Sequence, residues 1–191
     1  LSDLKSLNAK DLDQFANSGS YTRVTQRYAP HNVYTSIAKL NELEAKKGFT
    51  SANFTGFERK KEAPATTLTA NVIDLKISST NFNAHYAYEG ASNSYKRSVG
   101  GKPHTDEKSG AQLAPKVVVA VVMQRGIDGD GQHTNYTTTG SGKVYVFQDG
   151  VVTEGTWSKT SRSAQWTFVD ANNKPLTFNP GQTWFSMVDT P

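Results

Sequence analysis

Hydrophobic and polar positions divide the chain into a mixed first part and a strand-rich second part. The most apolar stretch is 117–122, an unbroken run of valine and alanine that is too short for a buried helix. Because β-branched residues dominate it, the run predicts a strand that is covered on both faces. Further on, the β-rich runs 143–148 and 151–157 flank the dipeptide Asp149-Gly150. This pattern predicts a tight hairpin, since both turn residues must adopt a positive φ.

Short alternating segments predict the remaining strands of the second part. They lie at 70–77, 85–88, 95–99, 165–169, 174–178 and 183–188, and turn-forming residues separate them. Short strands at this spacing are typical of all-β architectures. The sequence therefore predicts a mostly antiparallel β domain over residues 67–191, built as an open barrel or a sandwich.

One helix is predicted in the first part of the chain. Thr35 or Ser36 caps its start, and Gly48 ends it after two lysines that suit the negative end of the helix dipole. Its apolar stripe consists of Ile37, Leu40 and Leu43. The charged stretch that follows ends in proline, so we interpret residues 58–66 as a connection between two domains.

Composition places the chain among soluble globular proteins and narrows its chemistry. Of its 191 residues 36% are hydrophobic and 20% are charged, and no apolar run is long enough to span a membrane. The absence of cysteine excludes disulfides, thiolate metal sites and a cysteine nucleophile. A net charge of +4 without an arginine-rich run argues against a nucleic-acid partner. We find no cofactor motif.

A first candidate cluster lies just before the helix. Arg23 and Arg27 stand four residues apart, and His31 and Asn32 follow them. Two guanidinium groups with an imidazole and an amide can clamp a carboxylate or a phosphate. Alternatively, the same side chains tie an irregular loop to backbone carbonyls.

A second candidate cluster lies on a loop between strands. His104 and Asp106 stand two residues apart, where they can act as an acid–base pair or contribute to a metal site. A catalytic metal site needs three protein ligands, however, and His31 supplies a third only if the two segments meet. Alternatively, the loop is hydrogen-bonded to itself. We therefore assign no catalytic residue and no metal ligand.

Three further motifs are interpreted as structural. Residues 128–131 resemble the start of a calcium loop but lack its later carboxylates, which indicates a turn. The triplet 140–142, Gly-Ser-Gly, lacks the strand-to-helix setting of a nucleophile elbow. Three tryptophans offer a sugar-stacking surface, although aromatic residues in sheets usually belong to the core. They are Trp157, Trp166 and Trp184.

Several motifs, taken in order, resemble the YerB-like family of bacterial lipoproteins, whose activity is not established. The motifs are Arg23-x-x-x-Arg27-Tyr28-Ala29-Pro30-His31-Asn32-Val33-Tyr34-Thr35, Gly100-Gly101-Lys102-Pro103-His104-Thr105-Asp106, Gly140-Ser141-Gly142-Lys143-Val144-Tyr145-Val146-Phe147, Gly155-Thr156-Trp157-Ser158-Lys159 and Asn179-Pro180-Gly181-Gln182-Thr183-Trp184. The resemblance runs through most of the chain.

The resemblance implies an α+β organisation in two domains. Residues 1–62 would be the C-terminal fragment of an N-terminal α/β domain, and residues 67–191 the mostly β C-terminal domain. It also implies that the opening strands of the first domain and the lipid-attachment cysteine are missing, so that a missing part of its own domain becomes a partner for the helix. The family suggests an extracytoplasmic protein that is tethered to the membrane of the cell envelope only through that lipid anchor.

The leading hypothesis is non-catalytic binding of an anionic or polar ligand where the two parts meet. Arg23, Arg27, His31 and Asn32 would face the ligand from one side, with His104 and Asp106 on the other. The expected partner is a cell-wall glycan or peptide, or an envelope protein. Two alternatives stay open: a hydrolase that uses His104 with Asp106, with or without a metal, and a purely structural or protein-interaction module.

Overall fold

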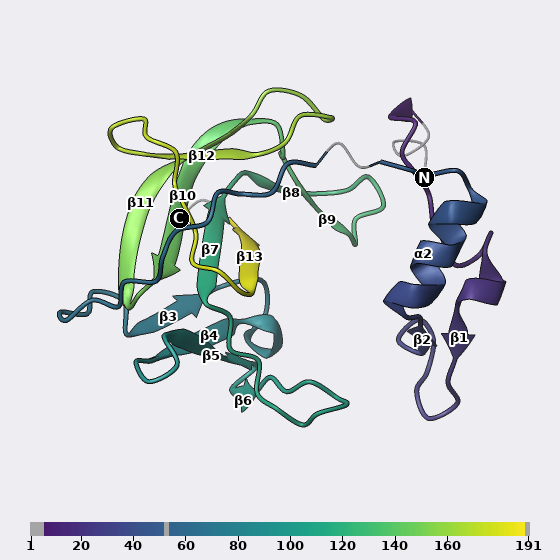
Figure 1. Cartoon of the computed structure of the whole chain (residues 1–191), viewed down its shortest axis with the longest axis horizontal. Helices are drawn as coiled ribbons and strands as arrows, with labels where there is room; N and C mark the ends of the chain where they lie inside the picture. The colour runs from purple at the N-terminus through teal and green to yellow at the C-terminus, as the bar shows by residue number, and fades with distance from the viewer. Residues whose placement is uncertain (1–5, 52–53, 190–191) are drawn as a thin grey trace. The chain divides into compact units, whose positions relative to one another are not determined.

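The computed structural model describes residues 6–51 and 54–189. By internal contacts the chain separates into two compact units, Leu1–Thr55 and Gly56–Pro191. Figure 1 shows the helices and strands of both units.

The described residues of the first unit form several short elements and a helix of ten residues. A 3-10 turn, η1 (Ser18–Ser20), precedes the two-residue strands β1 (Thr22–Arg23) and β2 (Val33–Tyr34), which pair in antiparallel fashion. The predicted helix is confirmed as α2 (Ile37–Lys46). The Ser36 hydroxyl accepts a hydrogen bond from the Lys39 amide, so Ser36 is the cap. Of the predicted apolar stripe, Leu43 is buried whereas Ile37 is 73% exposed.

In its described residues the second unit has three sheets. The largest has the strand order β12-β11-β10-β7-β13, the second has the order β3-β4-β5-β6, and a small one pairs β8 with β9. The strands are β3 (Val72–Leu75), β4 (Ala84–Glu89), β5 (Ser94–Val99), β6 (Lys102–Pro103), β7 (Val117–Val122), β8 (Arg125–Ile127), β9 (Thr134–Tyr136), β10 (Gly140–Gln148), β11 (Val151–Lys159), β12 (Thr167–Asp170) and β13 (Thr183–Val188), with the 3-10 turn η2 (Thr80–Phe82) between β3 and β4.

The observed architecture fits the predicted α+β class, with mostly antiparallel sheets. Every strand pair of this unit is antiparallel except β13 with β7, which is parallel. The described strands do not close into a barrel.

One predicted strand is wrong: residues 174–178 form only isolated bridges, from Pro175 to Val169 and from Phe178 to Arg59. Pro175 pairs with β12 whereas Phe178 pairs with Arg59, so no single ladder runs along this segment.

Strand β7 organises the core, as the apolar run predicts. Val117, Val119 and Val121 belong to one core cluster, which is rich in aromatic residues. Val118 and Ala120 belong to a second cluster, formed with side chains of β3, β4 and β5. Because successive strand residues point to opposite faces, both faces of β7 are covered.

The predicted hairpin at Asp149-Gly150 is confirmed, and the segment 58–65 lies against it. The two residues have φ of 57° and 76°, and β10 and β11 pair from Gln148 and Val151 onward. The predicted connection lies against this hairpin, because the Ala65 amide donates to the Asp149 carbonyl. Residues 58–65 therefore lie within the second unit.

Candidate functional site

The large sheet opens between β7 and β10. The ladder that joins these strands runs from the pair Val118–Phe147 to the pair Val121–Val144 and stops there. The chain segments meet again where the Thr137 amide donates to the Gln124 carbonyl, at 2.9 Å. Between these two points the backbone segments are not paired, and the sheet has a gap.

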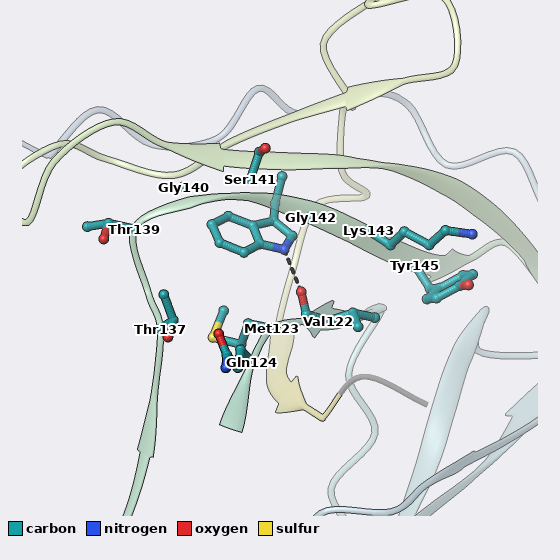
Figure 2. Close-up of a pocket in the computed structure, with 11 residues that line it drawn as sticks. Val122, Met123, Gln124, Thr137, Thr139, Gly140, Ser141, Gly142, Lys143 and Tyr145 are labelled. Carbon is teal, nitrogen blue, oxygen red and sulfur yellow. Dashed lines mark hydrogen bonds between the residues drawn. The ribbon is translucent and has the colours of Figure 1, made fainter. Parts of the chain in front are cut away.

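Trp157 bridges this gap from the neighbouring strand. Trp157 lies on β11 directly opposite Gly142 on β10. Its indole N–H donates to the Val122 carbonyl on β7, at 2.7 Å (Figure 2). The indole therefore crosses β10 at Gly142. A Cβ at that position would lie 2.7 Å from the indole nitrogen and 2.9 Å from the Val122 oxygen, so only glycine fits.

A pocket of about 490 Å³ occupies this part of the sheet. Its lining residues are Val122, Met123, Gln124, Thr137, Thr139, Gly140, Ser141, Gly142, Lys143, Tyr145 and Trp157 (Figure 2). Met123 and Trp157 are 2% exposed and form apolar walls. Hydroxyl and amide groups supply the polar lining. An apolar concavity with a few polar groups is the usual form of a ligand site.

Two features define the chemistry of this pocket. Strand β10 pairs with β11 along Gly140–Lys143, but its ladder to β7 begins only at Val144, so this stretch has an edge without a strand partner. In addition, the one charged side chain of the lining, Lys143, is already paired in a 2.8 Å ion pair with Glu154. The hydrogen bond to Glu154 raises the pKa of Lys143. The pocket therefore suits an uncharged polar ligand.

His104 lies outside this pocket and contacts an arginine that sequence analysis overlooked. Arg97 on β5 donates through Nη1 to His104 Nδ1, so the imidazole carries its proton on Nε2. The His104 ring also packs edge-on against Trp184, with ring centroids 5.9 Å apart. Burial lowers the pKa of His104, and the nearby Arg97 charge lowers it further. At neutral pH His104 is thus an uncharged hydrogen-bond acceptor.

Asp106 shapes its own loop. Its Oδ1 atom accepts hydrogen bonds from the Ser109 amide at 2.8 Å and from the Ser109 hydroxyl at 2.7 Å. These bonds lower the pKa of Asp106. No hydrogen bond joins His104 to Asp106 within residues 54–189. This geometry matches the self-bonded loop that the sequence left as an alternative.

Of the four candidate residues in the first unit, Arg23 and Asn32 contact each other. Arg23 donates to the Asn32 side chain at 2.8 Å and to the Gln14 side chain at 3.1 Å. Arg27 and His31 are exposed. The idea that these residues share a ligand with His104 stays a prediction.

The structure also shows the surroundings of the three tryptophans and tests whether acidic and histidine side chains group into a metal site. Trp157 is buried, and Trp166 packs against Phe168 and Phe185. Trp184 stacks on the Arg97 guanidinium. Within the described ranges, no three or more His, Asp or Glu side chains lie together as a group that could hold a metal ion.

Two local signals in the sequence point to the residues that were overlooked. Gly100-Gly101 is a two-residue turn, and it predicts a hairpin in which Arg97 faces His104. The structure has this register, with Val99 opposite Lys102. Likewise, the glycine at 142 inside a strand indicates a close approach, here by Trp157.

Comparisons with known proteins agree with this architecture. Residues 73–185 match the model of a family described as "Protein of unknown function (DUF3048) C-terminal domain". The chain belongs to the DUF3048 family. The crystal structure of the YerB protein from Bacillus subtilis is similar, with a TM-score of 0.77 and 26% sequence identity over 97% of this chain. The resemblance to a YerB-like family is therefore confirmed. No curated protein matches the chain.

The DUF3048 chain spans 62% of the length of that YerB structure. Within the described residues, no helix combines the length and apolar character needed to cross a membrane.

Proposed function

We propose that this DUF3048 chain is a non-catalytic binding protein that holds a polar cell-wall ligand in the pocket beside Trp157. The favoured ligand is a peptide in extended conformation. The observation that carries the proposal is the unpaired edge of Gly140–Lys143, which borders an apolar pocket.

Two physical arguments support a peptide. An unpaired strand edge presents backbone N–H and C=O groups that an extended chain can pair with, while neighbouring pockets receive its side chains. The pocket wall is also built on strands, held by the hydrogen bond from Trp157 to Val122. A site on strands is positioned before the ligand arrives, which lowers the entropic cost of binding.

The cellular setting forms part of the same proposal. Resemblance to the YerB-like lipoproteins supports an extracytoplasmic location at the cell envelope, tethered by a lipid. In that setting cell-wall peptides and glycans are the abundant polar polymers. The proposal therefore assigns the pocket to peptidoglycan rather than to a soluble metabolite.

Co-sedimentation with purified peptidoglycan sacculi tests the proposal. The informative variant is Thr139→Phe, which places a ring in the pocket from its half-buried lining. The matched control is Thr160→Phe, the same change at an exposed position outside the lining. We expect saturable binding that weakens about tenfold or more in Thr139→Phe, a loss of roughly 1.4 kcal/mol, and stays unchanged in the control.

Soluble fractions then identify the ligand. Stem peptides and glycan strands released from the sacculi are titrated separately by calorimetry. Binding of the peptides supports the peptide assignment, whereas binding of the glycan strands alone corrects it. Absence of binding to sacculi, or equal binding by Thr139→Phe, overturns the proposed function.

A further inference from the structure

Arg97 is a buried charge in the interior of the second unit. It lies on β5 opposite Tyr86 of β4 and is 7% exposed. Its guanidinium carbon lies 4.2 Å from the ring centroid of Trp184 on β13 and 5.7 Å from that of Tyr86. Arg97 is thus held among aromatic rings contributed by both larger sheets.

The hydrogen-bond partners of this guanidinium are all neutral. Nε donates to the Tyr86 hydroxyl at 3.2 Å, and Nη1 donates to His104 Nδ1. Within the described part of the chain, no ion pair joins Arg97 to a carboxylate. Taking a charge out of water is costly unless an opposite charge or hydrogen bonds compensate. Stacking on aromatic rings offsets part of this cost.

Part of the Arg97 guanidinium remains available to donate hydrogen bonds to a ligand. The second terminal nitrogen, Nη2, donates no hydrogen bond to a described residue. The fully enclosed side-chain atoms without a partner are Tyr95 Oη and Trp166 Nε1 in the described residues. Because Nη2 is not one of them, it keeps access to solvent. A planar fork with free donors matches the two oxygens of a carboxylate or phosphate.

We propose that Arg97, supported by Trp184 and His104, is a binding site for an oxyanion, a carboxylate or a phosphate group. The anion pairs with the free donors of the guanidinium, while His104 and Tyr86 hold the other side of the fork. Arg97 is the residue that binds, and Trp184 and His104 position it. None of these side chains lines the pocket beside Trp157, so this site is separate from the proposed peptide site.

NMR titration of the whole chain tests the site with defined probes. Sodium acetate and N-acetylglycine represent carboxylates, inorganic phosphate represents phosphates, and sodium chloride at equal ionic strength is the control for screening. The signals to follow are the Arg97 Nε–H and the Trp184 indole N–H. We expect saturable shifts of both with at least one oxyanion and none with chloride.

Two arginine variants make the test specific. Arg97→Lys keeps the charge but removes the planar fork, and we expect it to weaken binding about tenfold or more. Arg59→Lys is the control at an exposed position, where the arginine also donates to neutral oxygens, those of Asn179 and Thr183. Shifts with acetate and N-acetylglycine alone assign a carboxylate, and shifts with phosphate alone assign a phosphate.

Three results overturn the proposal: equal shifts with chloride, shifts that spare Arg97 and Trp184, or Arg97→Lys binding as tightly as the wild type. If Arg97→Lys fails to fold, the wild-type titration still tests the proposal, because it shows whether the Arg97 and Trp184 signals are the ones that shift.

Discussion

Two buried charges of the second unit are held in opposite ways. Asp149, 4% exposed, forms an ion pair with Lys60 and accepts hydrogen bonds from Asn93 at 2.8 Å and from Asn179 at 2.7 Å. The Ala63 amide adds a further bond at 3.2 Å. Arg97 is nearly as deeply buried, but its partners are a hydroxyl, an imidazole and aromatic rings.

The difference separates a structural charge from a binding charge. Every partner of Asp149 comes from the chain itself, and these partners join the hairpin turn to residues 60–63 and to Asn93 and Asn179. Arg97 retains donors that nothing in the described chain uses. A fully paired buried charge stabilises one conformation, whereas an incompletely paired one favours the arrival of a ligand.

Asp149→Asn should give the largest effect. Asparagine tolerates the positive φ of this turn, so the change removes the charge and spares the backbone. We expect a loss of roughly 3 kcal/mol or more in the free energy of unfolding, because Lys60 loses its carboxylate partner and faces an amide NH2 donor instead, while Oδ1 remains an acceptor for Asn93 and Asn179. Urea denaturation measures it. The control is Asp74→Asn, an exposed carboxylate that pairs with His85, and an equal loss in both would contradict a structural role.

Acid should unfold the wild type through the same residue. Burial alone raises the pKa of Asp149, but the hydrogen bonds from Lys60, Asn93 and Asn179 outweigh burial and lower it below its ordinary value of 3.8. A lowered pKa in the folded state means that this stabilisation is complete above pH 3.8 and is lost as pH falls through the folded-state pKa. Denaturation curves from pH 6 to pH 2 should fall less steeply for Asp149→Asn, and parallel curves would refute the assignment.

Arg97→Met should cost far less stability than Asp149→Asn. Methionine fills similar space against Trp184, and it removes a charge whose burial is incompletely compensated. We expect a change within about 1 kcal/mol in urea denaturation, together with complete loss of oxyanion binding. Arg59→Met measures the effect of the same change at an exposed position. A loss as large as that of Asp149→Asn would make Arg97 structural and remove the contrast.

The smallest effect should come from His104. Its pKa is lowered below the ordinary value of 6.5 by burial and by Arg97, so the unfolded chain takes up a proton more readily than the folded one. Stability is therefore complete above pH 6.5 and declines as pH falls toward the folded-state pKa. Wild type should lose more stability than His104→Gln between pH 7 and pH 5. His85→Gln, at an exposed position, measures the background effect of the change.

Strong local signals made much of the fold predictable. The helix that ends before Gly48, the apolar strand β7 and the hairpin at Asp149-Gly150 each follow from residues close together in sequence. The strand predicted at 174–178 failed because alternation does not reveal that its two ends pair with different segments, Pro175 with Val169 and Phe178 with Arg59. His104 was found because a histidine on a loop is conspicuous, although its partner proved to be Arg97 rather than Asp106.

The sequence by itself determined where strands, turns and the helix lie, because backbone conformation and periodic burial are written in neighbouring residues. Only the tertiary structure decided that β13 lies parallel to β7, that Trp157 crosses Gly142, and that Trp184 stacks on Arg97. These contacts join residues far apart in the chain. Whether a buried charge finds an opposite charge depends on which strands become neighbours, and no local pattern records that choice.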